Sequence, residues 1–178
     1  MLSQKNNSNT NIETFNDFKN TEFVYIKHIS SKHIFKLPYT AAIHSKYITS
    51  NIIENMTSNN YGKIRTNPMI INDADTNIDF QSMEFVINYM KYYDNHKENI
   101  APEAPIKNIH ISLIIGDEYK LFDSIYDEQD SLKEKLSKIN NIVIASLYFK
   151  IKYLHKKLCA ISASLLLNSN IDEIKRII

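Results

Sequence analysis

The hydrophobic pattern of the chain changes character along its length, and this change limits the folds that the chain can adopt. Two β-rich runs, 23–29 and 33–37, lie near the start and are separated by only three polar residues, as in a hairpin. Helical spacing of apolar residues then fills the end of the chain, over 132–148, 152–167 and 172–178. Strands mixed with helices, followed by helices alone, predict an α+β fold in which a small sheet is packed by helices.

The middle of the sequence predicts two helices and one further strand. Thr40, which follows Tyr39 and a proline, is a candidate N-cap for the first helix. Residues 68–71 have the composition of a short buried strand. The apolar residues of 80–90 fall on one face of the second helix, for which Asp79 or the nearby Asn77 is the candidate N-cap.

The length of 178 residues suits one hydrophobic core, so a single domain is expected. Residues 1–21 are rich in Asn, Ser, Thr and Lys and predict a disordered polar arm. The folded core is expected over 22–126, with a variable surface insertion at about 94–126, where charges and two prolines interrupt the pattern. Residues 127–178 are expected to form the C-terminal helices.

The charge balance gives no reason to expect nucleic acid or a membrane as partner, because the net charge is only +1. The lysines of 150–157 are better explained as stems that cover an apolar helix than as a nucleic-acid patch. The apolar runs 142–149 and 158–167 are too short to span a bilayer, and the polar N-terminus does not resemble a secretory signal. A single cysteine, Cys159, favours a reducing compartment, so cytoplasm or nucleus is expected.

Enzymatic chemistry finds little support in the residue types. Only two glycines occur, Gly62 and Gly116, so a glycine-rich phosphate-binding loop is excluded. The Gly-x-Ser-x-Gly motif is missing, and the acidic residues cluster in irregular segments typical of solvated surface. His155 and Cys159 have the i, i+4 spacing of two ligands on one helix face, but a packed cysteine beside a surface histidine is the simpler interpretation. We expect no catalytic residue, no cofactor and no metal.

Four short motifs follow one another along residues 23–178. They are Ile34-Phe35-Lys36-Leu37 with Ala42, Ser45, Ile48 and Ile52; Val86, Tyr89, Met90 and Tyr92; Glu128 to Lys133; and an unbroken stretch from Ala145 to Ile178. Their common order resembles the adaptor family of the SCF ubiquitin ligases, the S-phase-kinase-associated adaptor and elongin C. The last two motifs are similar to the D-Q-E-F-L-K, A-A-N-Y-L-D-I-K-x-L and P-E-E-I-R-K segments of that family.

The resemblance implies a BTB/POZ fold, in which a three-stranded sheet is flanked by helices and further helices follow at the C-terminal end. It implies a non-catalytic adaptor that bridges a cullin scaffold and an F-box or elongin-type box protein, so that a substrate receptor is brought to the ubiquitin-transfer machinery. Binding of this kind is helix packing in an apolar groove. A homodimer is also compatible with the resemblance.

Site residues follow from the resemblance one position at a time. Tyr148 matches the family's cullin-contacting tyrosine, and Leu147 replaces the asparagine beside it. This replacement exchanges a hydrogen-bonding group for an apolar one, which leaves the choice of cullin open. On the F-box side, contacts are expected from the apolar faces of the last two helices, at Ile161, Leu165, Ile174 and Ile178. Simple core packing is the alternative for the first two of these.

The C-terminal end departs from the family in a second way. The family member that binds F-boxes continues past the position of Ile178 with acidic helical residues and a Trp-containing tail, whereas elongin C stops earlier. An F-box partner held by a shortened clamp is therefore expected. The alternative is a BTB module that self-associates, or that decoys a host partner without assembling a ligase, as a viral or parasite copy would. Tight binding of a cullin N-terminal domain would contradict this alternative.

Overall fold

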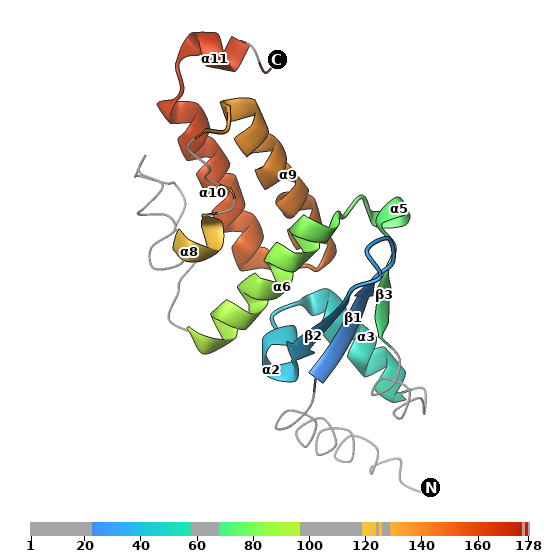
Figure 1. Ribbon diagram of the computed structural model, residues 1–178. Helices are drawn as coiled ribbons and strands as arrows, with labels where there is room; N and C mark the ends of the chain where they lie inside the picture. Colours follow the sequence, from blue (N-terminus) through green and yellow to red (C-terminus); the bar gives the residue numbers. More distant parts are fainter. Residues whose placement is uncertain are drawn as a thin grey trace, which may run out of the picture.

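The computed structural model describes residues 23–57, 68–96, 119–123, 125, 129–175 and 177, and these form a mixed α+β fold (Figure 1). The elements are β1 Phe23–His28, β2 Ile34–Pro38, α2 Tyr39–Ala42, α3 Lys46–Thr57, β3 Met69–Ile71, α5 Asp73–Thr76, α6 Phe80–Asn95, α8 Tyr119–Phe122, α9 Leu132–Tyr148, α10 Lys152–Asn168 and α11 Ile171–Lys175. The sheet lies at one end, α9 and α10 stand side by side at the other, and α6 lies between them. The predicted α+β class is confirmed.

The sheet has the strand order β2-β1-β3. β1 and β2 are antiparallel and are joined by a turn in which Lys32 has a positive φ of 58°, while β3 is parallel to β1. Because side chains alternate along a strand, Val24 and Ile26 of β1 and Phe35 and Leu37 of β2 share the inner face and are buried there. The predicted hairpin is confirmed, and a third strand is present as β3. The prediction that this strand is buried is wrong, because β3 lies at the edge of the sheet and only Ile71 is buried, whereas Ile70 is 60% exposed.

The first predicted helix is interrupted, so the prediction of one helix capped by Thr40 is wrong. α2 begins directly after Pro38 and ends at Ala42, and a turn separates it from α3, which begins at Lys46. The Thr40 hydroxyl lies within α2 and donates a hydrogen bond to the carboxylate of Asp94 at 2.6 Å. This bond ties α2 to the end of α6.

A buried serine explains the interruption. Ser45 lies in the turn between α2 and α3, where its hydroxyl donates to the carbonyl oxygen of Phe149 at 2.6 Å and accepts the backbone N–H of Ile48 at 3.1 Å. The backbone N–H of Tyr47 donates to the same carbonyl oxygen. The chain leaves the helical path at this turn, and the Ser45 hydroxyl thereby reaches a carbonyl 104 residues away. The start of α3 is thus fixed to the corner between α9 and α10.

Replacement of this serine is expected to destabilise the fold. Ser45→Ala removes the donor to the buried Phe149 carbonyl and the acceptor for the Ile48 N–H, so the free energy of unfolding should fall by about 1–3 kcal/mol in urea denaturation. Ser50→Ala is the matched control, because the exposed Ser50 hydroxyl only donates to the Lys46 carbonyl within α3. Its effect should stay within about 0.5 kcal/mol. Equal losses for the two variants would show that the link to Phe149 adds no stability.

The second predicted helix, α6, begins where it was expected. Asp79 is its N-cap, and the Asp79 carboxylate accepts the backbone N–H of Ser82 at 2.7 Å. The helix continues to Asn95, so its last turn reaches into the range predicted as a surface insertion. Its buried face packs between the sheet and α9 and includes Met83, Phe85, Val86, Ile87 and Met90. α6 is therefore the middle layer of the core.

Other expectations lie wholly or partly outside the described residues. These are the polar arm over 1–21, the strand that the apolar run 109–115 predicts, and most of the insertion at about 94–126. Within the last of these, α8 forms a helical turn where irregular structure was expected, and Phe122 packs against Phe85 with ring centroids 5.1 Å apart. The predicted domain boundaries remain predictions.

The three predicted C-terminal helices are present as α9, α10 and α11, the last of them over Ile171–Lys175, while residues 176 and 178 of the predicted 172–178 helix lie outside the described residues. A capping box begins α9: the Ser131 hydroxyl accepts the backbone N–H of Glu134 at 3.3 Å, and the Glu134 carboxylate accepts the backbone N–H of Ser131 at 2.8 Å. At the other end of α9 the chain reverses at Lys150, which has a positive φ of 54°. α10 consequently runs back alongside α9.

The capping box predicts a pH-dependent contribution to stability. Hydrogen bonds from the Ser131 hydroxyl, and next from its backbone N–H, lower the pKa of Glu134. The stabilisation is present above the ordinary pKa of a glutamate and is lost as the pH falls through the lowered value. Ser131→Ala should lower the free energy of unfolding in urea denaturation at neutral pH, as the loss of an N-cap does, and should lower it by less in acid. A cost that does not change with pH would contradict the role of the Glu134 carboxylate.

Candidate functional site

The corner between α9 and α10 holds the two residues expected to contact a cullin. Leu147 and Tyr148 occupy the last turn of α9, directly before the fully buried Phe149 and the chain reversal at Lys150. Ser45 fixes this corner through the Phe149 carbonyl. The local backbone is therefore held by contacts from the turn between α2 and α3 and the start of α3, and the side chains of the last turn project from a fixed support.

Leu147 and Tyr148 differ in their surroundings. The Leu147 side chain is 53% exposed. Tyr148 is half-buried: its hydroxyl donates to the Tyr47 hydroxyl at 2.8 Å, and the two rings lie 4.7 Å apart between centroids. Burial, followed by the hydrogen bond with Tyr47, raises the pKa of the Tyr148 phenol well above its usual range. Tyr148 therefore stays protonated and supports the corner, while Leu147 is the side chain presented to solvent.

The four residues expected on the F-box side lie in different environments. Ile161 is fully buried, which favours the alternative that it packs in the core of the chain itself. Leu165 and Ile174 are half-buried, and Leu165 packs against the edge of the core. Ile178 lies outside the described residues. Leu165 and Ile174 are therefore the two of the four that keep surface for a partner.

Three exposed apolar residues near the junction of α10 and α11 were not selected from the sequence. Leu166, Leu167 and Ile171 are 39%, 71% and 70% exposed. The three consecutive leucines at 165–167 could have indicated this exposed surface, because successive helix residues point about 100° apart and cannot all face one core. The apolar surface at this end of α10 is therefore larger than the sequence interpretation allowed.

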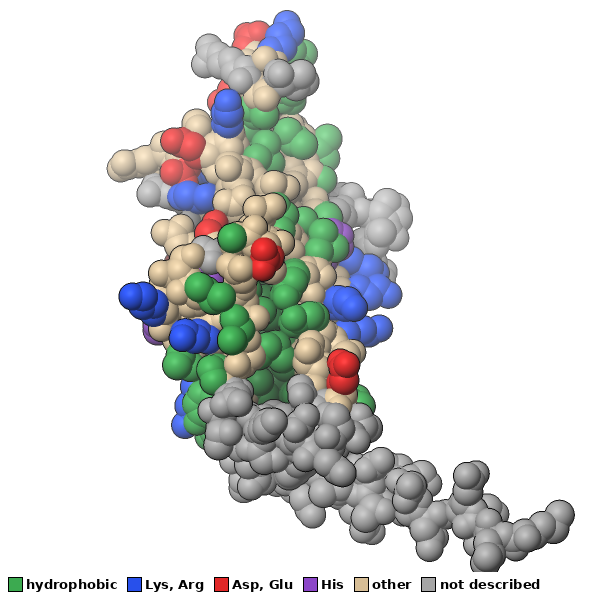
Figure 2. Space-filling view, turned by 90° about the vertical axis from the view of Figure 1, so that its right-hand side faces the viewer, with side chains coloured by type: hydrophobic (Ala, Val, Ile, Leu, Met, Phe, Trp, Pro, Cys, Tyr) green, Lys and Arg blue, Asp and Glu red, His purple; other side chains and the backbone are tan. Residues whose placement is uncertain are grey.

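Figure 2 shows the side of the molecule on which β3, α5 and α9 lie in Figure 1. Hydrophobic side chains form a band along this side, and basic side chains lie on both flanks of the band. An exposed apolar area bordered by polar groups is typical of surfaces that bind another protein. This side therefore suits an apolar protein partner better than a small charged ligand.

His28 and Cys159 lie in surroundings that the sequence did not reveal. His28 is buried, and its ring lies 3.0 Å from the Ser31 hydroxyl and 3.1 Å from the carbonyl oxygen of Ile78, so it joins the hairpin to the start of α6. Cys159 is exposed, with its sulfur 3.8 Å from Nε2 of His155. The expected packed cysteine is therefore wrong, because this position of α10 faces solvent.

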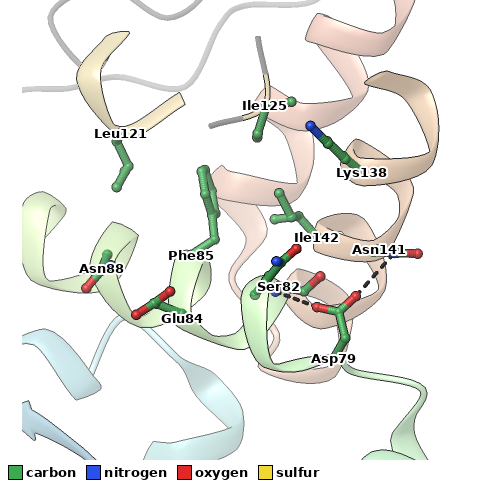
Figure 3. A pocket seen from close by; sticks show the side chains of 11 residues that line it. Asp79, Ser82, Glu84, Phe85, Asn88, Leu121, Ile125, Lys138, Asn141 and Ile142 are labelled. Carbon is green, nitrogen blue, oxygen red and sulfur yellow. Dashed lines mark hydrogen bonds between the residues drawn. The ribbon is translucent and has the colours of Figure 1, made fainter. Parts of the chain in front are cut away.

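A pocket of about 450 Å³ lies between α6, α8 and α9 (Figure 3). Its walls combine apolar and polar side chains, namely Asp79, Gln81, Ser82, Glu84, Phe85, Asn88, Leu121, Ile125, Lys138, Asn141 and Ile142. No local motif marks it in the sequence, because three elements far apart in the chain supply the walls. It was missed for that reason.

The chain matches no protein-family model and no curated protein. The resemblance of its motifs to the SCF adaptors, and the BTB/POZ fold that the resemblance implies, therefore remain predictions. The roles carried over to Leu147 and Tyr148 are predictions for the same reason. The α+β class with a three-stranded sheet rests on the structure itself.

The described part of the chain offers surfaces for binding. Within it, no group of three or more His, Cys, Asp and Glu side chains is arranged to hold a metal ion. None of its helices is both long enough and apolar enough to cross a bilayer. Exposed apolar side chains lie near both ends of α10. Leu147 and Tyr153 lie near its first turn, and Leu167 and Ile171 lie near its last turn. These two regions are the candidate functional surfaces.

Proposed function

We propose that this chain is a non-catalytic adaptor of a cullin-based ubiquitin ligase, which bridges a cullin scaffold and an F-box-type substrate receptor. The observation that carries the proposal is the last turn of α9. This turn lies in the stretch with the most continuous resemblance to the SCF adaptors, and it presents Leu147 to solvent beside the fixed ring of Tyr148. An apolar side chain on a rigid corner is suited to packing against a partner helix.

The two candidate surfaces are far enough apart for two partners to bind at once. α10 has 17 residues, which corresponds to about 25 Å along its axis. Leu147 lies in the last turn of α9, five positions before the first residue of α10, and the exposed Leu167 and Ile171 lie in and beyond the last turn of α10. A cullin at the first surface would therefore leave the second surface open to an F-box helix, as bridging requires.

The proposal is tested by binding of purified partners to the full chain. Isothermal titration with a cullin N-terminal domain and with an F-box peptide should show one site for each, and size-exclusion chromatography should show a ternary complex. Absence of binding to both partners would overturn the adaptor function. A chain that binds neither but sediments as a dimer would instead support the self-associating BTB module, whose exposed Leu147 would then lie in the dimer contact.

A further inference from the structure

The pocket between α6, α8 and α9 is separate from the surfaces assigned to the adaptor function. Lys138 and Ile142 of α9 line the pocket. Leu147 follows Lys138 by about two and a half helical turns, so the two side chains project from opposite sides of α9. An occupant of the pocket would therefore leave the Leu147 surface free.

The floor of the pocket is apolar and firmly held. Figure 3 shows the ring of Phe85 between Leu121 on one side and Ile125 and Ile142 on the other. Phe85, Ile125 and Ile142 are each at most 6% exposed, and the edge-to-face contact of Phe85 with Phe122 fixes the ring. The volume of about 450 Å³ is in the range of pockets that hold a small ligand or a few side chains.

The edge of the pocket formed by α6 is acidic. Glu84 lies on this edge and Asp79 at the start of the helix, whereas Lys138 lies across the pocket on α9 (Figure 3). The ammonium group of Lys138 is paired with the carboxylate of Asp130. Asp79 accepts hydrogen bonds from the backbone N–H of Ser82 and the side chain of Asn141, at 2.7 and 3.2 Å. Neither Asp79 nor Glu84 forms an ion pair with another described residue. The Asp79 charge is partly balanced by the start of α6, which it caps, whereas the exposed Glu84 carboxylate is the acidic group that this edge offers to a cation.

We propose that this pocket binds a basic amphipathic helix of a partner protein, with one apolar side chain on the Phe85 floor, a neighbouring Lys or Arg beside Glu84, and a second basic residue toward Asp79. An apolar side chain gains by leaving water for the floor, and cations on the adjoining turns gain from the carboxylates. An acidic segment would meet repulsion at the same edge. The proposal does not depend on the adaptor function, because the pocket and the Leu147 surface are on opposite sides of α9.

The test uses a labelled peptide of about 15 residues with leucines at helical spacing and lysines elsewhere, and a twin with glutamate for lysine. Fluorescence anisotropy with the full chain should show binding of the basic peptide at least about tenfold tighter than binding of the acidic twin, with a difference that shrinks in salt. Amide NMR shifts caused by the basic peptide should centre on Ser82, Phe85 and Ile142. Absence of binding at millimolar peptide, or equal binding of the twins, would overturn the proposal.

Two variants separate this pocket from general attraction to acidic surface. Glu84→Lys should weaken binding of the basic peptide about tenfold. Asp172→Lys makes the same charge change at an exposed position of α11 and should alter this binding less than about twofold. Asn88→Trp adds a large ring at the exposed rim without disturbing the core and should also weaken binding. Equal effects of Glu84→Lys and Asp172→Lys, or full binding to the Asn88→Trp chain, would show that the peptide binds elsewhere.

Discussion

Phe149→Ala is expected to lower the free energy of unfolding by about 3–5 kcal/mol, enough to remove a large part of the stability of a single domain. The Phe149 ring is fully buried at the corner between α9 and α10, and it packs edge-to-face against Tyr47 and Tyr148 with centroids 6.1 and 5.4 Å away. Its removal leaves a cavity where α3 meets the corner between α9 and α10. Urea denaturation followed by circular dichroism measures the loss.

The matched control is Leu147→Ala, two residues earlier in the chain. Leu147 is 53% exposed, so Leu147→Ala removes apolar atoms that are already largely in water and should change the free energy of unfolding by less than about 1 kcal/mol. A small loss for Phe149→Ala, or an equal loss for the two variants, would show that the corner is not part of the cooperative core. A small loss for Leu147→Ala would show that this side chain contributes little to the core of the chain itself.

The sequence predicted those elements whose signals are local. The alternation in β1 and β2, and the cap at Asp79, are each set by residues within a few positions of one another, so pattern and composition suffice. The three C-terminal helices follow the same logic, since their apolar spacing is continuous. Local propensity and tertiary packing agree in these segments, and for that reason their predictions hold.

Elements that depend on distant contacts could not be predicted. The break before α3 exists because the Ser45 hydroxyl reaches the Phe149 carbonyl, a contact that no window of sequence contains. The pocket has the same origin, because α6, α8 and α9 each supply only part of its wall. Ile161 and Leu167 illustrate the limit for the candidate site: both are apolar residues of α10, and only packing decides that the first is buried and the second exposed.

Single charged substitutions should separate the two binding surfaces of the proposed adaptor. Leu147→Asp is expected to weaken binding of a cullin N-terminal domain at least about tenfold, because burial of a carboxylate in an apolar contact is costly. Binding of an F-box peptide should not change. Leu167→Asp should do the reverse. Both side chains are more than half exposed, at 53% and 71%, so both variants should keep the circular dichroism spectrum and unfolding midpoint of the parent chain.

The crossed design makes each variant the control for the other. Loss of both partners by either variant would indicate damage to the fold and would be visible as a lower unfolding midpoint. Unchanged binding of both partners by both variants would remove Leu147 and Leu167 from the proposed contacts. If the chain is instead a self-associating module, Leu147→Asp should convert a dimer to a monomer in sedimentation velocity while no cullin binds, because an exposed apolar residue at a rigid corner can serve a second copy as well as a foreign helix.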